Sequence, residues 1–95
     1  MRENEFRRYL EDSEQITSKE KAVKSRVSRA YVAEEILGDD LDNIVKDDKK
    51  MYESLLIIKQ SPREKNGNIQ NALRWYYQFA NGKKFPVIRA EYYME

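Results

Sequence analysis

The densest group of potential metal ligands in the sequence is a set of five aspartates between residues 39 and 48: Asp39, Asp40, Asp42, Asp47 and Asp48. A calcium-binding EF-hand loop requires a glycine at its sixth position, where this stretch has Ile44 or Val45. Carboxylates also favour the positively polarised starts of helices. The spacing therefore predicts that these aspartates begin helices, and it predicts no metal site.

The sequence offers little for covalent or acid–base catalysis. With no Cys and no His among its 95 residues, it has no thiolate nucleophile, imidazole base or disulfide. The three glycines, Gly38, Gly67 and Gly82, stand alone and form no phosphate-binding loop. A catalytic carboxylate pair is compatible with the composition, but a small helical chain leaves little room for a substrate cleft of about 300 Å³ or more. We predict a protein that is not an enzyme and takes no cofactor.

Basic residues concentrate toward the end of the sequence. Residues 31–58 carry three basic and eight acidic side chains, whereas residues 59–84 carry one acidic residue, Glu64, and six basic ones: Lys59, Arg63, Lys65, Arg74, Lys83 and Lys84. A second polar and basic group comprises Lys19, Lys21, Lys24 and Ser25. If folding gathers the two groups on one face, they can contact the phosphates of a nucleic acid. The alternative is that they only keep helix surfaces solvated.

Apolar periodicity predicts that these residues lie on helices and on the loops that connect them. Helices are expected over residues 3–12, from Thr17 to Gly38, over 48–60 and over 68–81, with a brief helix or turn near 39–45. Thr17 and Glu20 fit a capping box, and Asn68 is expected to cap the last helix. The prediction is an all-α bundle of four to five helices in residues 1–86, followed by a tail, 87–95, whose structure the pattern does not define.

The order of these patterns resembles a known family. Phe6, Tyr9 and Leu10 precede a long helix that opens at Thr17, and the last helix carries Ala72-Leu73-Arg74-Trp75-Tyr76-Tyr77 followed by Phe79. Over most of residues 5–86 the sequence resembles the N-terminal, SAM-like core-binding domain of tyrosine recombinases and phage integrases. The resemblance implies a four-helix domain that clamps one side of duplex DNA while a separate catalytic domain closes on the other side.

The same resemblance implies where DNA would be contacted. In that family the contacts come mainly from basic and polar residues of the second and fourth helices, here those over residues 17–38 and 68–81. The matching positions are Lys21, Lys24, Ser25, Asn71 and Arg74. The family's catalytic set includes histidine, which this sequence lacks, so Tyr92 and Tyr93 are not expected to be nucleophiles.

Two functional hypotheses follow. The first is a non-catalytic DNA-binding domain that contacts duplex phosphates through its second and fourth helices. The second is a protein-interaction module, such as a small regulator or inhibitor from a phage or mobile element, that uses its acidic middle or aromatic tail. A helix-turn-helix with residues 39–50 as recognition helix is disfavoured, because its aspartates would face phosphates. No signal peptide or apolar run of about 18 residues is present, so a cytoplasmic protein is expected.

Overall fold

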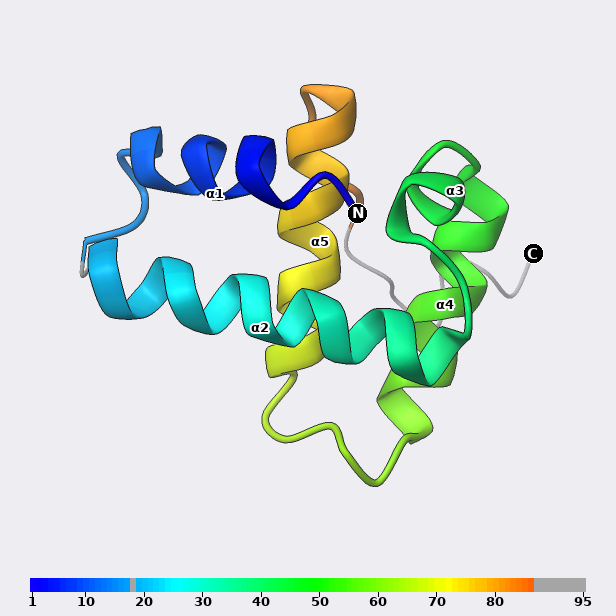
Figure 1. Cartoon of the computed structure of the whole chain (residues 1–95). Coiled ribbons are helices and arrows are strands. Elements are labelled where there is room, and N and C mark those ends of the chain that lie inside the picture. The colour runs from blue at the N-terminus through cyan, green and yellow to red at the C-terminus, as the bar shows by residue number, and fades with distance from the viewer. Residues whose placement is uncertain (18, 87–95) are drawn as a thin grey trace.

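Helix boundaries fall at the capping and turn residues of the sequence. The computed structural model describes residues 1–17 and 19–86, and within them it contains five helices and no strand. They are α1 (Glu3–Asp12), α2 (Lys19–Leu37), α3 (Leu41–Val45), α4 (Asp48–Gln60) and α5 (Asn68–Asn81) (Figure 1). The all-α prediction is confirmed, and the brief element near residues 39–45 is a helix. The fourth helix of the sequence-based numbering is α5.

The aspartates begin helices as predicted. Asp40 precedes α3, and its Oδ1 accepts a hydrogen bond of 2.8 Å from the backbone N–H of Asp42. Asp47 precedes α4, and its Oδ1 accepts from the N–H groups of Lys49 and Lys50. These bonds satisfy backbone donors that have no partner within the first turn of a helix. The predicted capping box of Thr17 and Glu20 spans residue 18, which lies outside the described residues.

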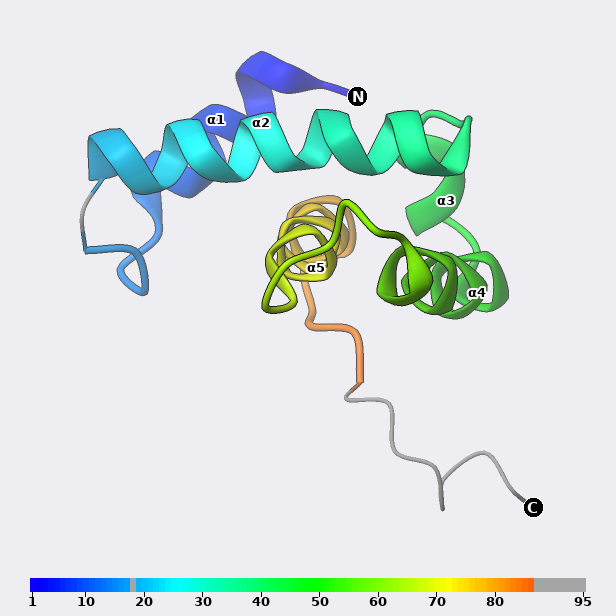
Figure 2. The ribbon, with the colours of Figure 1, turned by 90° about the horizontal axis from the view of Figure 1, so that it is seen from below.

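The helices cross in two layers. α1 runs beside α2, and α2 crosses over α4 and α5, which lie next to each other on its far side (Figures 1 and 2). Helix α1 has 10 residues, fewer than the roughly 12–15 that a helix needs for marginal stability in isolation. Its two buried side chains, Phe6 and Leu10, therefore have to hold it against the rest of the chain.

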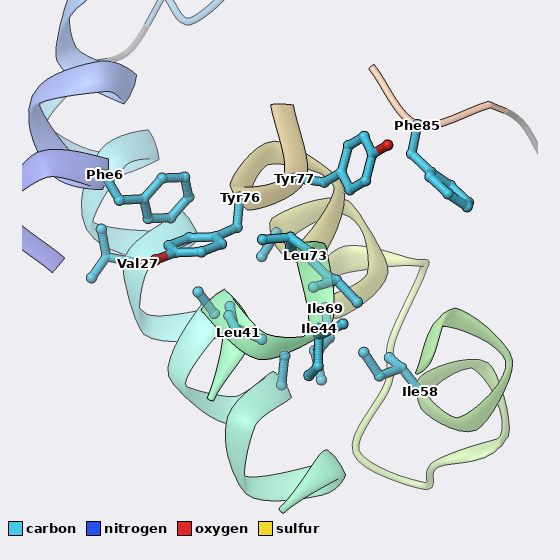
Figure 3. Close-up of a cluster of buried hydrophobic side chains, with 14 of the residues drawn as sticks. Phe6, Val27, Leu41, Ile44, Ile58, Ile69, Leu73, Tyr76, Tyr77 and Phe85 are labelled. Carbon is cyan, nitrogen blue, oxygen red and sulfur yellow. The ribbon is translucent and has the colours of Figure 1, made fainter. Parts of the chain in front are cut away.

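Each helix contributes buried side chains to one core. The close-up in Figure 3 shows this core with Phe6 of α1, Val27 of α2 and the residues that α3, α4 and α5 supply, among them Leu41, Ile44, Ile58, Leu73, Tyr76 and Tyr77. Phe6 lies edge-on to Tyr76 with ring centroids 5.0 Å apart, and its centroid is 5.7 Å from that of Phe79. The run of aromatic residues on α5 thus packs largely inward.

Two buried tyrosines form hydrogen bonds with two of the remaining aspartates. The Tyr76 hydroxyl donates to Asp42 Oδ1 at 2.6 Å and accepts from the backbone N–H of Arg2 at 2.9 Å. The Tyr77 hydroxyl donates to Asp48 Oδ1 at 2.7 Å, and burial together with this carboxylate raises the pKa of Tyr77 to about 12. The acidic segment therefore connects α3 and α4 to α5 as well as beginning helices.

The described chain ends in a short segment outside the helices, residues 83–86. Phe85 of this segment is buried and packs edge-on against Tyr77, with centroids 5.0 Å apart (Figure 3). The tail beyond residue 86, with Tyr92 and Tyr93, lies outside the described residues. Within residues 1–17 and 19–86, no helix combines the length and apolarity of a membrane-spanning segment.

Candidate nucleic-acid interface

One face of α5 stays outside the core and lines a hollow. Asn71, Arg74, Trp75 and Gln78 follow the spacing i, i+3, i+4, i+7, so they lie along one side of the helix. The hollow has a volume of about 260 Å³, and its walls are completed by Gln15, Lys84 and Phe85. Among the described residues, no carboxylate lines it. The hollow therefore combines amides, an aromatic ring and cations.

Arg74 holds one wall of this hollow in place. Its Nη1 donates to the backbone carbonyls of Phe85 at 3.0 Å and Pro86 at 3.2 Å, and its guanidinium lies 5.8 Å from the centre of the Phe85 ring. The segment that carries Lys84 is thereby fixed beside α5. Arg74 is both a source of positive charge and a structural tie.

Trp75 is packed against a second arginine. The guanidinium carbon of Arg26, on α2, lies 5.6 Å from the Trp75 ring centre, while Tyr9 contacts the ring edge-on at 6.4 Å. Burial lowers the pKa of Arg26 from its ordinary value, and the charge of Arg29 lowers it further. The Nε of Arg26 is buried and has no hydrogen-bond partner within residues 1–17 and 19–86. Two neighbouring guanidiniums therefore raise the positive potential beside α5.

A second hollow lies at the start of α5. It has a volume of about 290 Å³, is lined by Arg29, Val32, Arg63, Lys65, Asn68 and Ile69, and again contains no carboxylate among the described lining residues. Asn68 and Asn71 are one turn apart on α5, so the two hollows follow one another along the helix. We call their cations, Arg29, Arg63, Lys65, Arg74 and Lys84, the basic band. Arg63 of this band pairs with the exposed Glu35 at 3.0 Å.

Carboxylates line hollows elsewhere on the molecule. A hollow of about 280 Å³ between the end of α2, α3 and α4 includes Asp39 and Glu53, and a hollow of about 350 Å³ beside the start of α4 includes Asp48. Each of these two also contains a lysine. The charge segregation of the sequence thus persists in the fold, with the basic band beside α5 and the acidic residues toward α3 and α4.

The structure brings together only part of the predicted contact set. Asn71 and Arg74 share the first hollow. Lys21 and Lys24 are exposed on the face of α2 turned away from its buried stripe, and Ser25 is half-buried. The segment to which Arg74 bonds leaves α5 on the side opposite α2 (Figure 2). The two lysines of α2 therefore do not share a face with Arg74.

Sequence reasoning missed several residues of this surface. Gln15, Gln78, Arg26 and Arg29 were not among the predicted contact residues, and Trp75 was named only as part of the motif on the last helix. A signal was available on α5, because polar or amphipathic side chains recur there at helical spacing opposite the buried face. The contact between Arg26 and Trp75 depends on how α2 and α5 cross, which helical periodicity does not specify.

The start of α5 differs from the prediction. Asn68 is the first helical residue instead of the cap, and Gly67 precedes it. The carboxylate of Glu64 closes the helix start, accepting from the N–H of Ile69 at 2.9 Å and of Gln70 at 2.8 Å. The prediction that Asn68 caps the helix failed because Glu64, in the preceding loop, accepts the hydrogen bonds from these backbone N–H groups. The anion-favouring end of α5 is already occupied by this carboxylate.

Glu64 gives an expected pH dependence of stability. Burial alone would raise the pKa of Glu64, but its hydrogen bonds from the Ile69, Gln70 and Lys65 backbone hold the pKa below the ordinary value. The Glu64 carboxyl therefore binds its proton more tightly in the unfolded chain than in the folded one. The stability that ionised Glu64 contributes is fully present above a pH of about 4.3, and it is lost as the pH falls through the lower pKa of the folded state. At neutral pH we expect Glu64→Gln to reduce the free energy of unfolding by about 1 kcal/mol.

Urea unfolding of wild type and Glu64→Gln as a function of pH checks this prediction. The stability difference should close as the pH falls, because protonated Glu64 resembles glutamine. Glu53→Gln is the matched control, since it removes the same charge from an exposed position on α4. A difference between wild type and Glu64→Gln that stays constant down to acid pH contradicts the proposed role of the carboxylate.

Comparison of the chain with protein families, with curated protein sequences and with solved structures finds no match. The resemblance to the core-binding domain of tyrosine recombinases thus stays a prediction based on the residues quoted above. The arrangement of side chains on α5 is the remaining basis for a functional proposal.

Proposed function

We propose that this protein is a non-catalytic nucleic-acid-binding domain that contacts the phosphates of duplex DNA through the basic band. The observation that carries the proposal is the pair of hollows that border α5, whose described lining residues include five cations and no carboxylate; one of the cations, Arg63, pairs with Glu35 outside the hollow. Phosphate contacts from Lys and Arg supply most of the sequence-independent affinity of proteins for DNA.

The dimensions of the band suit a nucleic-acid backbone. Helix α5 has 14 residues and is therefore about 20 Å long, and phosphates on one DNA strand recur about every 3.4 Å along the axis. Because each strand winds around the axis, a straight band of this length faces only some of these phosphates. The amide side chains of Asn68 and Asn71 lie between the cations and can add hydrogen bonds to phosphate or sugar oxygens.

Affinity for a labelled duplex of mixed sequence, measured by fluorescence anisotropy at several salt concentrations, tests the proposal. Three to five phosphate contacts give a slope of about −3 to −4.5 for the logarithm of the association constant against the logarithm of salt concentration. We therefore expect affinity to fall by roughly two orders of magnitude between about 50 and 200 mM salt. Absence of binding at the lowest salt, or a slope near zero, contradicts the proposal.

A second candidate function has its own supporting observation. Ile57 is 53% exposed and lies with Leu37 and Ile44 in the hollow that also contains Asp39, Glu53 and Lys50, of which Lys50 pairs with Asp39 at 3.1 Å. An exposed apolar side chain bordered by carboxylates suits a basic, amphipathic protein partner, as in the interaction-module hypothesis. This function is favoured over DNA binding if the duplex does not bind at low salt and Ile57→Asp abolishes binding to an isolated partner protein.

A further inference from the structure

The hollow beside Trp75 has the chemical groups that a single nucleotide requires. It is lined by one indole ring, by the side-chain amides of Gln15, Asn71 and Gln78, and by the cations Arg74 and Lys84. Each amide carries both hydrogen-bond donors and an acceptor, as base edges do. Aromatic rings stack on bases of any identity, and cations bind phosphate. The basic hollow at the start of α5, lined by Arg29, Arg63, Lys65 and Asn68, has no aromatic ring.

The lining groups are held in position before any ligand binds. Trp75 contacts the Arg26 guanidinium and packs edge to face with Tyr9, and Gln78 Nε2 donates to the Tyr9 hydroxyl at 2.9 Å. Arg74 fixes the segment that carries Lys84 through its bonds to the carbonyls of Phe85 and Pro86. Preorganisation of this kind reduces the entropy that binding must overcome.

The size of the hollow limits its occupant. Its volume of about 260 Å³ lies just below the range of roughly 300–1,000 Å³ found for sites of drug-sized ligands. This is room for one base with its phosphate at the rim. A base that is stacked and paired inside a duplex cannot enter, so the occupant has to be unpaired.

We propose that the hollow formed by Trp75, Asn71, Gln78, Arg74 and Lys84 binds one unpaired nucleotide, with its base against the indole and its phosphate near Lys84. This inference rests on the proposed function, because the basic band would hold the flanking nucleic acid. It adds a preference for single-stranded segments, loops or junctions that a band of phosphate contacts alone does not give.

Trp75 provides a direct test because it is the only tryptophan in the sequence. We expect a short oligothymidylate, and more weakly thymidine monophosphate, to change the tryptophan fluorescence of the wild-type protein in a saturable manner. Inorganic phosphate at the same ionic strength should leave the fluorescence unchanged. A fluorescence change with phosphate alone overturns the inference, because it shows an anion site without base recognition.

Variants separate this inference from the proposed function. By anisotropy, Trp75→Leu is expected to weaken oligothymidylate binding by roughly 10-fold and duplex binding by less than about twofold. Circular dichroism shows whether the variant is folded. The fluorescence titration uses only the wild-type protein, so its result stands even if the variant does not fold. If the duplex binds with the expected salt dependence but no nucleotide changes the fluorescence of Trp75, the proposed nucleotide site is wrong, and the proposal that the basic band contacts phosphates stands. If neither duplex nor oligothymidylate binds at low salt, both proposals fail.

Discussion

Phe6→Ala is expected to lower the free energy of unfolding by about 3–5 kcal/mol. Phe6 is fully buried, and its ring contacts those of Tyr76 and Phe79 on α5. Removing the ring leaves a cavity and also frees a helix too short to be stable alone. A loss of this size is a large part of the total stability of a domain of this length.

Urea denaturation followed by far-ultraviolet circular dichroism measures this loss. Ile57→Ala is the control, because it also truncates a large apolar side chain but at a site that is 53% exposed. We expect the control to lower stability by less than about 1 kcal/mol. Similar losses for the two variants contradict the assignment of Phe6 to the core that joins α1 to α5.

Helix boundaries were predictable because the signals that set them are local. Asp40 and Asp47 accept hydrogen bonds from backbone N–H groups two or three residues further along the chain, so sequence spacing alone identifies them. Gly38 and Gly82 follow α2 and α5 with φ angles of 65° and 72°, a conformation that glycine adopts without strain. The same local logic predicted the helix over residues 48–60.

The start of α5 could not be predicted in this way. Asn68 has the residue type of a good cap, but the chain before it turns through Asn66 and Gly67, both with positive φ. This loop folds Glu64 back onto the N–H groups of Ile69 and Gln70, five and six residues ahead. Cap preference is a local rule, and here a loop conformation outweighs it.

The candidate site was predictable only within one helix. Asn71 and Arg74 are three residues apart, so helical spacing alone places them side by side, and both line the first hollow. The relation of Lys21 and Lys24 to Arg74 depends on the crossing of α2 over α5 and on the path of residues 83–86. Neither follows from periodicity, which is why the predicted set divides between two faces.

Charge reversal at the basic band is expected to have the largest effect on binding. Lys65 and Lys84 are exposed and lie in different hollows, so Lys65→Glu/Lys84→Glu removes one contact from each. Each lost phosphate contact weakens binding by about eightfold at about 0.1 M salt, so the double variant should lose roughly 50-fold in affinity. Its salt slope should become shallower by about two.

The matched control is Lys21→Glu/Lys24→Glu. It changes the net charge of +1 by the same amount and also replaces two exposed lysines, so any effect of total charge is equal in the two variants. These lysines lie on the face of α2 turned away from the buried stripe. We expect affinity to fall by less than about threefold and the salt slope to stay unchanged.

The most direct test of the basic band is the salt dependence of duplex binding for wild type and these two double variants, measured side by side. We expect a shallower slope and a large loss of affinity for Lys65→Glu/Lys84→Glu alone. Equal losses for both variants would contradict the basic band as the contact surface, because they would report only the change in total charge. A loss confined to Lys21→Glu/Lys24→Glu would also contradict it and would place the contact surface on α2.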